Sequence, residues 1–169
     1  MTIRLATRDD IPQIVQTDQA TVSDDELVGY GAPAVKRVLA DKAKLTAVWA
    51  GNSVQGLTVY VYEEKERVLG FILIRVDSDS VELDDIIVAI EHQKRGIGRA
   101  LVEFVENLAR NLEKHYVTLG TTRNTKTGIP WRSHNFWVKQ GYVVEEELET
   151  EEGRAYGFTE IRFRKQVLY

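Results

Sequence analysis

The sequence contains no cysteine, and its 169 residues include only three prolines. Without cysteine the chain forms no disulfide bond, no zinc–thiolate site and no acyl-cysteine intermediate. No apolar run approaches the roughly 20 residues that cross a bilayer, and the N-terminus lacks the apolar core of a signal peptide. No two of its histidines have metal-ligand spacing. These absences predict a cytoplasmic protein with no metal site and no membrane partner.

The charge balance is slightly acidic, with 26 Asp and Glu residues against 22 Lys and Arg. Binding to the phosphate backbone of nucleic acids requires a basic surface, so the net charge of −4 argues against a nucleic-acid partner. A hydrophobic content of 43% is ordinary for a globular protein, and the length suits one domain. We expect a single domain over residues 1–169, and a homodimer is left open.

The hydrophobic pattern changes between strand and helix periods along the chain. Strand-like segments lie at 3–6, 57–62, 68–76, 81–88, 117–122, 142–149 and 158–166. Helical spacing follows Pro12, Pro33 and Gly98 and covers 131–140. The predicted order is therefore βααβββαβαββ. A strand–helix–strand unit among antiparallel neighbours predicts an α/β (α+β) fold with a mixed sheet that contains a parallel pair.

A turn at 93–99, with the sequence Gln-Lys-Arg-Gly-Ile-Gly-Arg, follows one of these strands and opens an amphipathic helix. Helix N-termini offer free N–H groups and the positive end of the helix dipole to an anion. Glycine lets the backbone approach a phosphate without a Cβ clash, and Lys94, Arg95 and Arg99 add positive charge. The alternative is a plain turn with solvated basic residues. The preceding strand, the following helix and the basic cluster together favour an anion-binding turn.

Two familiar phosphate-binding motifs do not fit this turn. A Walker A loop requires Gly-Lys-Ser/Thr at a spacing that the sequence lacks. A Rossmann fingerprint requires a third glycine where Leu101 stands, and it belongs near the start of the chain rather than after several antiparallel strands. A dinucleotide-binding fragment is therefore disfavoured.

The remaining pattern is Gln-x-x-Gly-x-Gly preceded by Leu-Asp-Asp-Ile-Ile-Val at 83–88, and it resembles the coenzyme A motif of the GNAT superfamily of N-acetyltransferases. Residues 133–142, Ser-His-Asn-Phe-Trp-Val-Lys-Gln-Gly-Tyr, resemble the second motif of that superfamily, in which a helix carries an aromatic residue followed by three residues and then Gly-Phe or Gly-Tyr. The two motifs are one helix and one strand apart, and the order of elements matches from Ile3 to the C-terminus. The resemblance implies a GNAT-like acyl-CoA N-acyltransferase fold.

The resemblance also implies acetyl-CoA, with coenzyme A as its product, as the co-substrate. The backbone of Ile86, Ile87 and Val88 would pair with the pantetheine amides and leave an N–H to polarise the thioester carbonyl. The pyrophosphate would be held by the turn, through Gln93, Lys94, Arg95, Gly96, Ile97, Gly98 and Arg99.

The sequence departs from the family pattern at three positions. Ile90 stands where a proline is usual, and Pro130 stands where an asparagine is frequent, which makes Asn124 the candidate for that contact. Trp137 occupies the position of the tyrosine that is commonly taken to protonate the departing thiolate. Because an indole N–H is too weak an acid for that role, we expect Trp137 mainly to pack.

Two adjacent acids, Asp84 and Asp85, interrupt the alternation of the strand at 81–88. Adjacent carboxylates on a central strand are costly unless one faces an opening or the strand bulges. A bulge would splay this strand from the one at 117–122 and open a slot for pantetheine. One acid could simply cap the sheet while the other is solvated. The functional hypothesis is that Asp84 or Asp85 deprotonates the amine through water, with Glu82 or a water chain as the alternative.

The sequence therefore predicts an acyltransferase that moves an acetyl group from acetyl-CoA to a primary amine in a ternary complex. The glutamates within 145–152 are typical of a solvated hairpin, but they could also steer a cationic substrate. Together with Asp84 and Asp85 they favour a small cationic amine over a peptide or protein amine. The alternative function is a non-catalytic coenzyme A-binding sensor or scaffold, which would bind coenzyme A without any thioester turnover.

Overall fold

The computed structural model describes residues 1–21 and 57–169. The helix predicted after Pro33 lies outside these residues. The strands are β1 (Thr2–Leu5), β2 (Leu57–Glu64), β3 (Arg67–Val76), β4 (Ser80–Val88), β5 (Tyr116–Asn124), β6 (Val143–Leu148) and β7 (Phe158–Gln166). The helices are α1 (Ile11–Thr21), α4 (Ile97–Asn111), α5 (His134–Lys139) and α6 (Glu151–Tyr156), with short 3-10 turns η1 (Arg8–Asp10) and η2 (Ile90–His92).

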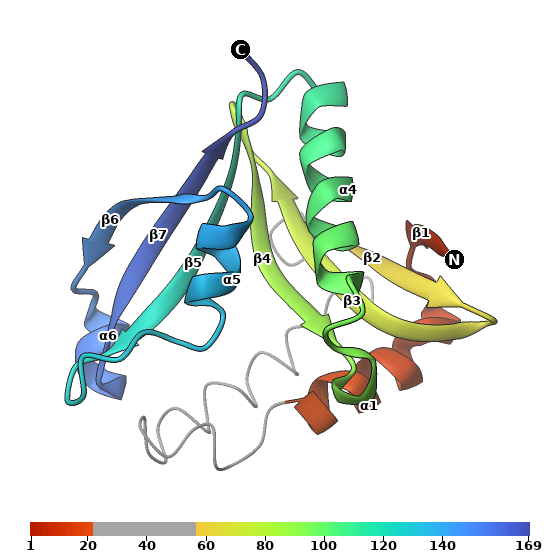
Figure 1. Cartoon of the computed structure of the whole chain (residues 1–169), viewed down its shortest axis with the longest axis horizontal. Coiled ribbons are helices and arrows are strands. Elements are labelled where there is room, and N and C mark those ends of the chain that lie inside the picture. Colours follow the sequence, from red (N-terminus) through yellow and green to blue (C-terminus); the bar gives the residue numbers. More distant parts are fainter. Residues whose placement is uncertain (22–56) are drawn as a thin grey trace.

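In the described part of the chain, the strands form one seven-stranded sheet in the order β1-β2-β3-β4-β5-β7-β6. All neighbouring pairs are antiparallel except β4 and β5, which are parallel and joined through α4. This confirms the predicted mixed sheet with a parallel pair. A parallel connection needs a crossover element, and α4 provides it across one face of the sheet (Figure 1).

Apolar side chains form a separate core cluster on each face of the sheet. The larger cluster joins β3, β4, β5 and β7 to α4 and α5, with Leu101, Val105 and Ile161 fully buried. The smaller cluster lies on the opposite face, where Ile14 of α1 packs against Phe71 and other residues of β2 and β3. The sheet is therefore sandwiched where β3 and β4 run, and this fixes the position of β4.

The C-terminal region differs from the predicted order by one helix. Residues 150–157 were expected to join two strands directly, but α6 lies between β6 and β7. The Thr150 side chain caps it by accepting a hydrogen bond from the Gly153 N–H at 2.9 Å, and Gly157 ends it in the left-handed conformation at φ 82°. The helix predicted at 131–140 is also shorter, because it begins at His134.

No helix in the described ranges 1–21 and 57–169 is both long enough and apolar enough to cross a membrane.

Candidate functional site

A bulge in β4 opens the centre of the sheet. Across β3 and β4, Leu73 lies opposite Asp85 whereas Ile74 lies opposite Leu83, so Asp84 is an extra residue in β4. The parallel pairing with β5 ends one residue earlier, at Leu83 opposite Leu119. Beyond this point the two strands diverge, as Figure 1 shows. The structure thus shows the bulge, which was one of the two ways to accommodate the paired acids, and the splay from the neighbouring strand expected of it.

The edge of β4 beyond the bulge presents backbone groups to the opening. The Ala89 N–H donates to the Leu69 carbonyl at 2.9 Å, so it points towards β3. Because N–H and C=O groups alternate in direction along a strand, those of Ile86 and Val88 point away from β3, and those of Ile87 point towards it. Ile86 and Val88 are therefore the residues of the predicted 86–88 segment whose amides face the opening.

The turn after η2 has a backbone suited to an anion. Lys94 and Gly96 have positive φ angles of 61° and 84°, and the Gly96 carbonyl accepts the first hydrogen bond of α4, from Ala100. Among the described residues, the backbone N–H groups of residues 94–99 have no protein acceptor. Free N–H groups at the start of a fifteen-residue helix, near the positive end of its dipole, fit a phosphate group.

Three side chains of this turn are held by other protein groups. Arg95 contacts the His92 Nδ1 at 2.7 Å and Glu64 at 3.3 Å, and Arg99 pairs with Glu103 at 2.8 Å. Gln93 donates from Nε2 to the Val88 carbonyl at 3.1 Å. These three side chains are thus held by other groups of the protein, whereas the backbone N–H groups of the turn have no acceptor among the described residues.

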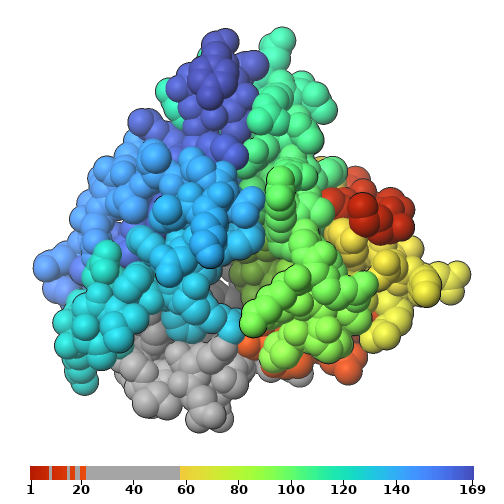
Figure 2. All heavy atoms as spheres, in the orientation of Figure 1, coloured from red at the N-terminus to blue at the C-terminus, as the bar shows by residue number. Residues whose placement is uncertain are grey.

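Gly98 lies where α4 approaches α5. A Cβ placed on Gly98 would lie 3.6 Å from the Phe136 ring and 3.8 Å from a Val88 methyl, which are ordinary contact distances. Gly98 thus joins the turn, the end of β4 and α5 in one neighbourhood. Figure 2 shows the surface hollowed between the atoms of α5 and those of the turn before α4. Phe136 was not predicted as a site residue, and only its place next to Trp137 in the second motif could have indicated it.

Trp137 is a core residue. Its side chain is 3% exposed, and its ring meets Phe136 at a centroid distance of 4.9 Å and Tyr142 at 5.4 Å. Tyr142 does not replace the absent tyrosine as an acid. Burial, and after it the nearby Glu106 carboxylate, raises the pKa of Tyr142 far above its usual range, so the phenol holds its proton.

Asn124 has a structural task at the end of β5. Its side-chain oxygen accepts hydrogen bonds from the backbone N–H groups of Lys126 at 2.9 Å and Thr127 at 3.1 Å, and the residue is 5% exposed. These bonds shape the turn that leads towards α5. The predicted contact of Asn124 with the co-substrate stays a prediction.

The two predicted acids lie at the bulge on the edge of the opening. Asp84 is exposed and Asp85 is half-buried. Because Asp85 lies opposite Leu73, which belongs to the α1-side cluster, its side chain faces the side of the sheet away from α4.

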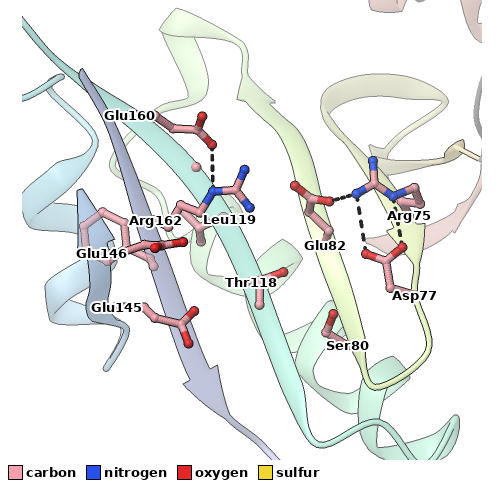
Figure 3. Close-up of a pocket in the computed structure, with 12 residues that line it drawn as sticks. Arg75, Asp77, Ser80, Glu82, Thr118, Leu119, Glu145, Glu146, Glu160 and Arg162 are labelled. Atoms are coloured by element: carbon pink, nitrogen blue, oxygen red, sulfur yellow. Dashed lines mark hydrogen bonds and ion pairs between the residues drawn. The ribbon is translucent and has the colours of Figure 1, made fainter. Parts of the chain in front are cut away.

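An acid-rich cavity of about 250 Å³ lies on that same side of the sheet, next to the last β4–β5 pair. Its carboxylates include Glu82, Glu145, Glu146 and Glu160, and its guanidinium groups belong to Arg75 and Arg162. Figure 3 shows Arg75 bonded to Asp77 and Glu82, and Arg162 bonded to Glu160. The carboxylates outnumber the guanidinium groups, so the lining is acidic.

Glu160 belongs to this lining but could not have been found from the sequence. Its carboxylate lies over Gly120, where a Cβ would come within 3.3 Å of it. In the register of β5 and β7, Gly120 lies opposite Arg162 and Glu160 lies opposite Thr122, so the approach of Glu160 to Gly120 is diagonal and depends on β7 lying beside β5. In residues 1–21 and 57–169, no group of His, Cys, Asp and Glu side chains is arranged to hold a metal ion.

Solved structures with this architecture include acetyltransferases. A GNAT-family protein from Desulfovibrio desulfuricans matches with a TM-score of 0.72 at 19% identity, over 99% of each chain. An aminoglycoside 6'-N-acetyltransferase in complex with coenzyme A matches with a TM-score of 0.70 at 16% identity, over 100% of this chain and 98% of its own. The ribosomal-protein-S18-alanine N-acetyltransferase from Escherichia coli matches with a TM-score of 0.68 at 15% identity, over 99% and 94%.

Sequence identities of 15–19% establish only that the fold is alike. The family is established by the match of the sequence to a family model. No curated protein matches the chain. The model of the acetyltransferase (GNAT) domain, however, matches residues 55–144, which is more than half of the chain and includes β4, the turn, α4, β5 and α5. The protein belongs to the GNAT acetyltransferase family.

Proposed function

We propose that this chain, as a single domain over residues 1–169, transfers the acetyl group of acetyl-CoA to a primary amine. The observation that carries the proposal is the continuity between the edge of β4 at Ile86 and Val88, which lies beyond the last residue paired with β5, and the N–H groups of residues 94–99, which have no acceptor among the described residues. The amides of an extended pantetheine arm can form hydrogen bonds with the β4 edge. The negatively charged pyrophosphate can accept hydrogen bonds from the N–H groups of the turn. The β4 edge and the turn that follows it together fit acetyl-CoA.

The chemistry needs a neutral amine next to the thioester. An ammonium group with a reference pKa near 10.4 first transfers a proton to a base, for which Asp84 and Asp85 are the candidates. The nitrogen lone pair then attacks the thioester carbon, the C–N bond forms, and the C–S bond breaks to release the thiolate of coenzyme A. The thiol has a pKa near that of cysteine, about 8.5, so the thiolate leaves near neutral pH without an obligatory acid.

We favour a small cationic amine as the acceptor. The acid-rich cavity adjoins the bulge on the side of the sheet that Asp85 faces, and its surplus of carboxylates would attract a substrate with more than one ammonium group. The aminoglycoside enzyme among the similar structures acts on a substrate of this kind. The ribosomal-protein-S18-alanine N-acetyltransferase represents the alternative class of acceptor, a peptide or protein amine.

Co-substrate binding is the first test. Coenzyme A and acetyl-CoA are expected to raise the melting temperature clearly more than NAD and ATP, which carry no pantetheine and would occupy only the pyrophosphate half of the site. Gly98→Val should abolish the shift, because branched carbon would fill the space beside the free N–H groups. Gly98→Ala is the matched control for folding, since its Cβ meets neighbours only at ordinary contact distances. Normal binding of coenzyme A by Gly98→Val would show that the turn has been wrongly assigned.

Turnover is the second test. Release of free coenzyme A is measured with a panel that contains monoamines, polyamines, aminoglycosides and peptides with a free N-terminus. An increase with at least one amine supports the transferase, and the amine that gives the highest kcat/KM identifies the acceptor class. Tight binding of coenzyme A with no release by any amine would instead favour the sensor or scaffold.

A further inference from the structure

Gln93 connects the two halves of the proposed co-substrate site. Its backbone belongs to the turn, where its N–H donates to the Ile90 carbonyl at 3.2 Å. Its side chain reaches back to β4 and donates from Nε2 to the Val88 carbonyl at 3.1 Å. The Val88 carbonyl belongs to the edge that faces the opening, since Val88 lies opposite Gly70 and the next residue, Ala89, bonds to β3.

This hydrogen bond is expected to contribute little to the free energy of unfolding. Gln93 is exposed, and water could satisfy the Val88 carbonyl equally well, so the net contribution to folding is small. Ordering a glutamine side chain also costs conformational entropy. What the bond does determine is geometry, because it ties the last residue of β4 to the start of the turn whose N–H groups are open.

The sequence pattern predicted that Gln93 contacts the co-substrate. We propose instead that Gln93 is a positioning residue, which couples the anion-binding turn to the β4 edge so that both halves of coenzyme A are bound in register. This inference rests on the proposed function. The Gln93 donor is occupied by Val88, and its effect on the co-substrate passes through the backbone of Val88 and of residues 94–99.

Measuring the binding of each half of coenzyme A separately distinguishes this coupling from a direct contact between Gln93 and the ligand. ADP carries a pyrophosphate and no pantetheine, and pantetheine carries the amides and the thiol but no phosphate. A residue that only aligns the two subsites affects the whole ligand more than either half, because each half can adjust to its own subsite. A residue that touches the pyrophosphate affects ADP and coenzyme A alike.

The experiment measures dissociation constants of ADP, pantetheine and coenzyme A by NMR titration for the full chain and for Gln93→Met. We expect the variant to bind coenzyme A about fivefold more weakly, as for the loss of one hydrogen bond, with less than about twofold change for ADP and for pantetheine. Gln93→Arg restores a donor within reach of Val88, so the selective loss for coenzyme A should disappear. Gln166→Met is the matched control, because Gln166 is also exposed and donates to a backbone carbonyl, that of Leu168 at 3.2 Å.

Each other outcome overturns the inference. An equal loss for ADP and coenzyme A would make Gln93 a direct pyrophosphate ligand, and an equal loss for pantetheine and coenzyme A would restrict its effect to the β4 edge. Unchanged binding of all three ligands would leave the Val88 bond without a role in binding. Failure of the proposed function has a different signature: if the co-substrate site is wrong, the unmodified chain binds none of the three ligands, and if only the transfer is wrong, the amine panel gives no release of coenzyme A while these dissociation constants are unaffected.

Discussion

At the scale of single residues, the carboxylates at the bulge carry the proposed proton transfer. Asp84→Asn or Asp85→Asn should lower the rate of acetyl transfer by about 10² or more while the affinity for coenzyme A stays nearly constant. The loss should become smaller as the pH rises, since more of the amine is then already neutral. Rates from pH 6 to 10 together with coenzyme A titrations measure both effects.

The control for the removal of a surface charge is Glu66→Gln, in the exposed turn between β2 and β3, which should keep full activity. If both aspartate variants retain the parent rate at pH 7, the base lies elsewhere. Glu82, which lines the acid-rich cavity and pairs with Arg75, would then be the next candidate.

Trp137 tests whether the chemistry needs an acid at the usual tyrosine position. Its ring is buried between Phe136 and Tyr142, so we expect Trp137→Phe to reduce turnover by less than about tenfold. Trp137→Ala should lower the free energy of unfolding by about 3–5 kcal/mol, because it leaves a large cavity in the core. Urea unfolding and steady-state turnover separate the two effects. A loss above a hundredfold for Trp137→Phe, with folding and coenzyme A binding intact, would reveal a direct role for the indole N–H.

At the scale of elements, one lysine joins α4, α5 and β7. The Lys165 Nζ lies 2.8 Å from the Glu106 carboxylate and 2.8 Å from the Gln140 carbonyl at the end of α5. Glu106 is 6% exposed, and its other cationic neighbour, Arg110, is 3.8 Å away. We expect Lys165→Met to lower the free energy of unfolding by about 1.5–3 kcal/mol, because a buried carboxylate loses its main partner.

The matched experiment combines Lys165→Met with Glu106→Gln. If the cost comes from the unpaired charge, the double variant should regain part of the lost stability in urea unfolding, since a neutral amide is less costly to bury. Simple addition of the two single costs would mean that the ion pair is not the source of the stabilisation.

The same scale shows what the sequence could and could not predict. The strand at 158–166 has its predicted bounds as β7, because strand alternation is a local signal. The bulge at Asp84 was predictable since two adjacent acids break that alternation visibly. Helix α6 was not predicted, since its start depends on a Thr150 cap and its end on the left-handed Gly157 within a run of glutamates that suits several structures. The position of Glu160 over Gly120 requires the neighbouring strand and has no local signal.

At the scale of the whole molecule, an ionic cluster ties the N-terminus to the sheet. Arg4 donates to both Asp10 oxygens, at 2.8 and 3.0 Å, and also to Glu63 on β2. The Arg4 hydrogen bonds hold the pKa of Asp10 below its usual value of 3.8. A group with a lowered folded-state pKa contributes stability that is present above its unfolded-state pKa and is lost as the pH falls through the folded-state pKa.

Asp10→Asn should therefore be less stable than the parent at pH 7, and the difference should shrink as the pH falls below about 4. Urea unfolding between pH 2 and 7 measures this dependence. Asp9→Asn, which removes a neighbouring exposed acid, serves as the control and should follow the parent profile. A constant difference across the whole range would mean that titration of Asp10 does not contribute to acid sensitivity.

The extra residue in β4 also shifts the phase of the strand. Before the bulge, Val81 and Leu83 belong to the core on the α4 side; after it, Ile86 and Val88 pack on that side while Ile87 packs on the α1 side. Before the bulge the odd-numbered side chains of β4 pack on the α4 side of the sheet, and after the bulge the even-numbered side chains do. A strand one residue shorter or longer here would exchange the two sets of side chains as well as change the opening. This segment can therefore accept substitutions far more readily than any change in its length.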